Sequence, residues 1–194
     1  MEVDIILDAG HGGFDNGASY MGRAEKDDVL RLTLAVGAKL KEAGYNVYYT
    51  RTTDVYNSPN EKAQLANLSG GNYFISFHRN SGMEDNLYNG VQTLIYQHND
   101  TVDTLAENIN RQLENVGFKN LGVEEVPGLI VLRKQKCRQF LWKPVLSTAT
   151  LITSFLTKNL MPSWMPLSQA SKKYSTFRTT GSGTLLRADR TVQI

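Results

Sequence analysis

The sequence is poor in cysteine and contains no long hydrophobic run. Its single cysteine, Cys137, excludes an internal disulfide and gives no indication of the redox compartment. A membrane-spanning helix needs about 20 consecutive apolar residues, so the sequence predicts no membrane span. Residues 1–4 lead directly into an apolar run, and we therefore expect no secretory signal peptide. The localisation is thus unknown from the sequence, and export would depend on a signal that lies elsewhere.

Acidic residues are nearly absent after Lys136. Up to that residue the chain has 18 aspartates and glutamates against 13 lysines and arginines, whereas the rest has one acid, Asp189, against eight bases. The two parts therefore carry net charges of about −5 and +7, which the overall charge of +2 conceals. A basic tail rich in serine and threonine is typical of a solvated arm, or of a patch that binds nucleic acid or the cell envelope.

The codons of this tail indicate a different origin for its composition. Trp has one codon, TGG, and every Lys codon begins with AA. The third base of Trp142 and the first two bases of Lys143 must therefore spell GAA, a glutamate. In the same shifted frame, residues 139–147 can read Val-Leu-Val-Glu-Ala-Gly-Phe-Ile, which is typical of a strand that ends in a glycine turn.

A second stretch gives the same indication. In the shifted frame, residues 160–167 can read Asp-Ala-Ile-Val-Asp-Ala-Ile, which has the spacing of an amphipathic helix. The protein itself has Pro144, Pro162 and Pro166 in these two stretches, and proline disfavours both elements. We therefore predict that residues 137–194 are an out-of-frame tail that is poorly ordered.

Before residue 137, short apolar runs alternate with segments of helical periodicity. Residues 26–43 place apolar side chains at helical spacing, and Gly44 is a natural helix end. Strands separated by helices of ten or more residues predict an α/β fold, a three-layer sandwich around a mainly parallel twisted sheet. The predicted strands are residues 3–7, 46–50, 72–77, 90–96 and 128–132, and the predicted helices are residues 26–43, 60–68 and 100–116.

Three polar side chains lie at the ends of predicted strands or at the start of a predicted helix, where ligand sites of such sheets are usually found. His11 follows the first predicted strand among glycines that allow a tight turn, and His78 follows the third strand. Glu25 begins the first long helix. Ligands bind where parallel strands run out into loops. Two imidazoles and one carboxylate suit a catalytic zinc, which takes three protein ligands and leaves one position for water.

Each of these residues also has a purely structural explanation. A histidine at a strand end is often a hydrogen-bonded loop residue, and Glu25 at a helix start interacts favourably with the helix dipole. The glycines around His11 fit a simple turn or a phosphate-binding loop as well. His98, after the fourth predicted strand, is expected at the surface. The residue pattern by itself therefore leaves the metal site and these alternatives open.

The chain resembles the type 3 family of N-acetylmuramoyl-L-alanine amidases, bacterial and phage zinc enzymes that cleave peptidoglycan. The resemblance implies an α/β fold with a six-stranded sheet, and zinc held by His11, Glu25 and His78. Lys62 and Arg79 depart from the family, in which an arginine and a small residue are common at these positions. The matching segments, in chain order, are residues 3–13, the helix start at Glu25, and residues 50–54, 63–67, 76–80 and 128–133.

The resemblance also implies a catalytic glutamate in a Val-Glu-x-Gly-Phe strand near the C-terminus, which this protein lacks. Its place falls at Trp142 and Lys143, where the shifted frame can read Val-Glu-Ala-Gly-Phe. In an intact relative, this glutamate takes a proton from the zinc-bound water and passes it to the departing L-alanine nitrogen. Asn80 is a candidate to orient the substrate amide, with a turn as the alternative role. Arg51 and Asp54 are interpreted as a structural pair that flanks the sheet, with contact to the substrate as the alternative.

The sequence therefore predicts a zinc-dependent amidase of peptidoglycan, acting at the bacterial cell wall as a monomer and impaired by the missing glutamate. Residues 1–136 form its incomplete catalytic domain, and no nucleic acid partner is expected. One alternative is a non-catalytic domain that binds peptidoglycan. Another is a globular domain with a basic nucleic-acid-binding arm, for which DNA binding should depend steeply on salt and require residues 137–194.

Overall fold

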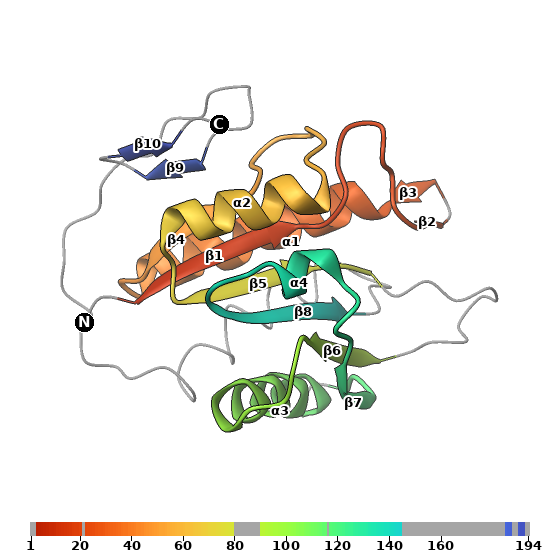
Figure 1. Cartoon of the computed structure of the whole chain (residues 1–194). Coiled ribbons are helices and arrows are strands. Elements are labelled where there is room, and N and C mark those ends of the chain that lie inside the picture. Colours follow the sequence, from red (N-terminus) through yellow and green to blue (C-terminus); the bar gives the residue numbers. More distant parts are fainter. Residues whose placement is uncertain are drawn as a thin grey trace.

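The computed structural model describes residues 3–20, 22–79, 90–115 and 117–144, together with two short strands near the C-terminus. Six strands form its central sheet: β1 (Asp4–Ala9), β4 (Asn46–Tyr49), β5 (Tyr73–Phe77), β6 (Val91–Ile95), β7 (Asn120–Glu125) and β8 (Arg138–Pro144). Their order is β4-β1-β5-β8-β6-β7 (Figure 1). Neighbouring strands are parallel except for β8 and β6, so the prediction of a mainly parallel sheet is confirmed.

Two antiparallel pairs form two-stranded sheets of their own. One joins β2 (Ser19–Tyr20) to β3 (Arg23–Ala24) in the connection between β1 and the first helix. The other joins β9 (Leu185–Arg187) to β10 (Arg190–Val192). Neither pair was expected from the sequence, because two- and three-residue strands are too short to show a periodic pattern.

Helices cover both faces of the sheet, as expected for a three-layer sandwich (Figure 1). They are α1 (Glu25–Glu42), α2 (Pro59–Ser69), α3 (Asp100–Glu114) and α4 (Ile130–Arg133). Successive side chains of a strand point to opposite faces. Ile5 and Leu7 of β1 accordingly pack in the core under α1 and α3, whereas Ile6 packs in the core under α2 and α4. No helix in these described parts is long and apolar enough to span a membrane.

Helix α2 shows how local sequence fixes the ends of an element. Ser58 and Glu61 form a capping box, in which each side chain accepts a hydrogen bond from the other residue's backbone N–H. Pro59 occupies the first turn, where its missing N–H costs nothing. Gly70 ends the helix in the left-handed conformation, with φ of 67°. The observed bounds agree with the predicted helix at residues 60–68.

The predicted strand at residues 128–132 is wrong. The short helix α4 begins at Ile130, and its buried residues Val131 and Leu132 join the core on the α2 side of the sheet. A short apolar run fits a buried helical turn as well as a strand. The strand that the sequence did not predict in this part of the chain is β7, an edge strand with partly exposed residues and Gly122 at φ of 89°, so its alternation is weak.

Strand β8 is formed by residues of the predicted out-of-frame tail. It lies between β5 and β6, and Leu141 is buried in the core on the α2 side. The register places Trp142 beside Phe77 of β5 and Thr93 of β6. Apart from Cys137, β8, β9 and β10, the tail lies outside the described residues. Its origin in a shifted frame and its poor order therefore stay predictions.

Candidate metal centre

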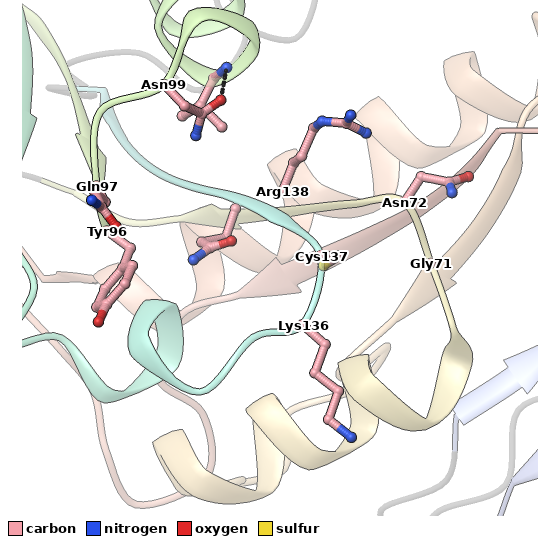
Figure 2. A pocket seen from close by; sticks show the side chains of 10 residues that line it. Gly71, Asn72, Tyr96, Gln97, Asn99, Lys136, Cys137 and Arg138 are labelled. Carbon is pink, nitrogen blue, oxygen red and sulfur yellow. Dashed lines mark hydrogen bonds between the residues drawn. The ribbon is translucent and has the colours of Figure 1, made fainter.

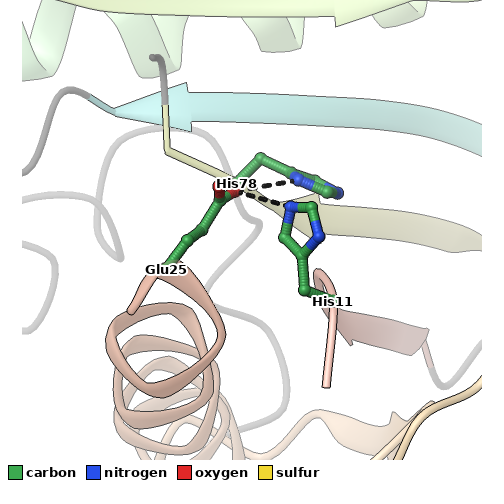
Figure 3. A group of neighbouring side chains, drawn as sticks. All are labelled: His11, Glu25 and His78. Atoms are coloured by element: carbon green, nitrogen blue, oxygen red, sulfur yellow. Dashed lines mark hydrogen bonds and ion pairs between the residues drawn. The ribbon is translucent and has the colours of Figure 1, made fainter. Parts of the chain in front are cut away.

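Three side chains converge at the edge of the sheet where the parallel strands β1 and β5 end. His11 follows β1, His78 directly follows β5, and Glu25 is the first residue of α1 (Figure 3). The Oε1 atom of Glu25 lies 3.1 Å from His11 Nε2 and 3.1 Å from His78 Nδ1. One ligand atom from each residue lies within 4.8 Å of the other two. The structure thus brings together the three residues to which the sequence analysis assigned a metal.

Two glycines allow the histidine rings to pack closely. A Cβ atom on Gly10 would lie 2.5 Å from Cε1 of His78, and one on Gly17 would lie 2.6 Å from Cδ2 of His11. The two rings meet edge to face, with centroids 4.8 Å apart. His11 itself has φ of 58°, a conformation that costs a non-glycine residue on the order of 1–3 kcal/mol. Tertiary contacts therefore hold His11 in a strained backbone conformation at the site.

Hydrogen bonds fix the orientation of the candidate ligands. His11 Nδ1 lies 2.9 Å from Asp15 Oδ2, which leaves the other ring nitrogen facing Glu25. The two oxygens of Glu25 accept hydrogen bonds from the backbone N–H groups of Ala18 and Arg79, each at 2.8 Å. A carboxylate behind a metal-binding histidine is usual, because it fixes the ring and raises its basicity. Asp15 was not predicted as part of the site, although it lies only four residues after His11 in the sequence.

The electrostatics of the site favour a bound cation. Burial by itself raises the pKa of Glu25, but hydrogen bonds with His11 and His78 and the charge of His78 hold it well below its usual range. Burial likewise disfavours the charged form of His11, yet the hydrogen bond and negative charge of Glu25, followed by those of Asp15, raise its pKa. Glu25 is therefore ionised at neutral pH, and its negative charge favours a cation bound between the carboxylate and the two imidazoles.

A buried ion pair supports the end of β1 beneath the site. Asp8 Oδ1 lies 3.0 Å from Lys62 Nζ, and its carboxylate accepts hydrogen bonds from Ser76, at 2.6 Å, and from Thr50. The Lys62 ammonium also donates to the Ala9 carbonyl at 2.7 Å. Burial alone raises the pKa of Asp8, but Lys62 and the two hydroxyl groups outweigh burial and lower it. This network was not predicted, because its members are far apart in the sequence.

We expect the substitution Lys62→Met to lower the free energy of unfolding by about 3–5 kcal/mol. The reason is that the Asp8 carboxylate would stay buried without its counter-charge. Urea denaturation followed by circular dichroism measures the change. The control is Lys39→Met, which removes the exposed Lys39–Glu42 pair and should cost less than about 1 kcal/mol. Equal losses in the two variants would contradict the role given to Lys62.

Arg51 is structural, as interpreted from the sequence, but its partner is not Asp54. Asp54 pairs instead with Lys26 Nζ at 2.8 Å and accepts a hydrogen bond from the Gly13 N–H at 2.8 Å. These contacts tie the loop that carries His11 to α1 and to the segment after β4. The Arg51 guanidinium donates to four backbone carbonyls, those of Ala9, Gly10, Lys26 and Thr53.

Arg79, at a position where a small residue was expected, forms an ion pair with a buried carboxylate. The guanidinium of Arg79 lies 3.2 Å from Asp28 Oδ2, and Asp28 also pairs with Arg23 and Arg31. Asp28 lies in the first turn of α1. Arg79 therefore connects the chain after β5 to α1, the two segments that supply two of the three candidate ligands.

The other residues singled out in the sequence have different outcomes. Asn80 lies outside the described residues, so its contact with substrate stays a prediction. Trp142 and Lys143 lie in β8, and Trp142 is paired with Phe77, the residue before His78. The position assigned to the missing glutamate therefore lies in β8, beside the end of β5, the strand that His78 follows.

A cavity of about 530 Å³ opens at the opposite edge of the sheet (Figure 2). It is lined by the segment before β5, the start of β8 and the segment after β6. Burial raises the pKa of the Cys137 thiol in its wall to about 11, so this thiol is protonated at neutral pH and a poor nucleophile. His98, also at this edge, is exposed as predicted, and its Nδ1 atom lies 2.9 Å from Asp103 Oδ1. Among the residues that the structure describes, the cluster of possible metal ligands therefore lies at the edge with His11.

Residues 5–153 match the protein family described as N-acetylmuramoyl-L-alanine amidase. The sporulation-specific N-acetylmuramoyl-L-alanine amidase of Bacillus subtilis (strain 168) is 32% identical over 139 residues, which cover 66% of this chain and 54% of that protein. The N-acetylmuramoyl-L-alanine amidase CwlM of Bacillus licheniformis is 40% identical over 95 residues, which cover 46% of this chain and 38% of that protein. The chain thus spans about half the length of these relatives or less.

Solved structures show the same similarity. The crystal structure of the N-acetylmuramoyl-L-alanine amidase from Clostridium difficile 630 superposes with a TM-score of 0.71 and 26% identity, over 80% of this chain and 89% of that chain. The stretch matched to the family includes the three candidate ligands, and it extends past the end of β8.

Proposed function

The chain belongs to the N-acetylmuramoyl-L-alanine amidase family, and we propose on this basis that it acts on peptidoglycan, at the amide bond between N-acetylmuramic acid and L-alanine. The observation that carries the proposal is the convergence of His11, Glu25 and His78 at one edge of the sheet. We propose the bacterial cell wall as the site of action, because peptidoglycan is found there.

The donor set fits zinc. Catalytic zinc is commonly held by imidazole nitrogens and a carboxylate oxygen, with a fourth position left for water or substrate. Asp15 behind His11 supplies the orienting carboxylate that such sites use, and Glu25 is ionised at neutral pH. When bound there, zinc supplies a water of lowered pKa and polarises the scissile carbonyl. Asp15, Ala18 and Arg79 keep the ligand atoms in place through hydrogen bonds.

The proton transfers of the reaction need a further group. A general base must lie within hydrogen-bond reach of the attacking water, and an acid must protonate the departing nitrogen. Strand β8 supplies Trp142 and Lys143 at the place assigned to the glutamate, and neither side chain is a carboxylate. We therefore propose that the chain binds metal and peptidoglycan and hydrolyses the amide only slowly. The same observation favours a second candidate function, a non-catalytic binder of peptidoglycan.

We expect the purified chain to bind one equivalent of zinc, measured by atomic absorption after dialysis. Release of L-alanine amino termini from isolated cell-wall sacculi then separates the two functions. Release above that of a heat-denatured control, and sensitive to chelation of zinc, supports the slow amidase. Zinc binding with sedimentation on sacculi and no release favours the non-catalytic binder. A chain that binds neither zinc nor sacculi contradicts both.

A further inference from the structure

Two aromatic side chains form an exposed pair on the loops after β1 and β4. Phe14 is 81% exposed and Tyr56 is 38% exposed. Their ring centroids lie 4.2 Å apart with an interplanar angle of 35°, so the two rings stack on each other and the mostly exposed Phe14 is supported by Tyr56. Exposing a large apolar ring loses the free energy that its burial would contribute, and adjoining exposed rings often mark a binding site.

The loop that carries Phe14 is held in place rather than free. Gly12 and Asp15 exchange two backbone hydrogen bonds across it, at 3.0 and 3.1 Å. The Gly13 N–H donates to Asp54, and the Gly13 carbonyl accepts from Lys26 at 2.7 Å. A Cβ atom on Gly13 would lie 2.9 Å from the Tyr56 nitrogen, so the two loops are in direct contact. The exposed rings thus stand on a rigid support, which lowers the entropy cost of binding.

The pair lies on the same edge of the sheet as the candidate metal centre. Phe14 follows His11 by three residues, so their Cα atoms are at most about 11 Å apart. Tyr56 lies in the segment after β4, whose neighbour in the sheet is β1. In peptidoglycan the scissile amide is joined through a lactyl group to a sugar ring. A substrate bound at the metal centre therefore has pyranose rings within reach of these side chains.

We propose that Phe14 and Tyr56 form a stacking platform for a pyranose ring of the glycan strand. The chemistry matches, because a pyranose has a face of C–H groups that packs on an aromatic ring and a rim of hydroxyls that stays hydrated. Lys26 and Asp54 beside the platform offer polar groups to that rim. This inference rests on the proposed function, and it adds a sugar subsite made by side chains that bind no metal.

The test is calorimetric titration of the full chain with glycan fragments from which the peptides have been removed. We expect the substitutions Phe14→Ala and Tyr56→Ala each to weaken binding roughly 3- to 30-fold, because the stacked face is lost. Phe14→Trp should keep the affinity, whereas Phe14→Leu, which is apolar but not flat, should lose it. Binding should persist in a zinc chelator, since the platform is independent of the metal. The matched control is Leu68→Ala, an exposed apolar side chain on α2, which should change nothing.

These measurements test the sugar platform independently of the proposed amidase function. Variants that bind the glycan as tightly as the parent, or a parent that does not bind it, overturn the platform. Zinc stoichiometry is measured on the same samples. If zinc is still bound, the loss of the platform does not contradict the proposed metal centre. If sedimentation shows that Phe14→Ala dissociates a dimer and leaves glycan binding unchanged, the pair is a contact between copies, which also overturns the proposal.

Discussion

A chain translated in the corrected frame after about codon 137 will hydrolyse peptidoglycan on the order of 10²–10⁴ times faster than the present chain. This range is the contribution that a positioned general acid and base makes to a reaction. The corrected frame supplies a glutamate at the place of Trp142 and Lys143, in the strand position beside β5. It also removes Pro144 from the end of the strand, and the codon choices at residues 144 and 145 allow the glycine turn that follows.

The corrected chain is compared with the present chain in the rate of release of L-alanine amino termini from sacculi, at equal zinc loading. The control is the corrected chain with its new glutamate replaced by glutamine, which keeps the shape and removes the carboxylate. That variant should return to the slow rate while its thermal unfolding stays unchanged. A corrected chain that is as slow as the present one, although folded and loaded with zinc, would show that the glutamate is not the missing group.

We expect His11→Ala and His78→Ala each to weaken zinc binding by more than about 100-fold. Loss of an outer partner of a metal ligand typically costs about 10- to 100-fold in affinity, and loss of a ligand atom should cost more. Two protein ligands would remain where a catalytic zinc site uses three. Competition with a chromophoric chelator measures the dissociation constant of each variant.

His98→Ala is the matched control, because it removes the third histidine of the chain. His98 is exposed and contacts Asp103, at the edge of the sheet opposite the metal centre. Its substitution should leave zinc affinity unchanged. If all three variants bound zinc as the parent does, the ligand set proposed here would be incorrect. A loss in all three would point instead to nonspecific binding by surface histidines.

The helices could be predicted from the sequence because their signals are local. The apolar spacing that ends at Gly44 indicated α1, and the helix predicted at residues 60–68 became α2. The strand predicted at residues 128–132 was wrong because its conformation depends on tertiary packing and not on a local signal. Its apolar run fits both a helix and a strand, and packing against α2 and β8 decided for the helix α4. Edge strand β7 lacked a clear alternation, so its pairing with β6 came from the tertiary structure.

The candidate ligands could be predicted because each stands at the boundary of an element. His11 and His78 follow buried strands, Glu25 begins a helix, and parallel strands bring their ends to one edge. Their supporting partners could not be predicted. Asp8 and Lys62 form a pair across 54 positions of the chain, and Arg51 binds carbonyls rather than Asp54. Nothing in the local sequence of either side chain specifies such partners.

The amino-acid sequence by itself determined the layered α/β class, the three candidate ligands and the absence of a carboxylate at the β8 position, because these depend on residue identity and local periodicity. Only the tertiary structure decided that one oxygen of Glu25 lies between both imidazoles, that Asp15 orients His11, and that Phe14 and Tyr56 meet at the surface. Those features require segments distant in sequence to pack at defined separations, and such separations follow from the closed core rather than from any local pattern.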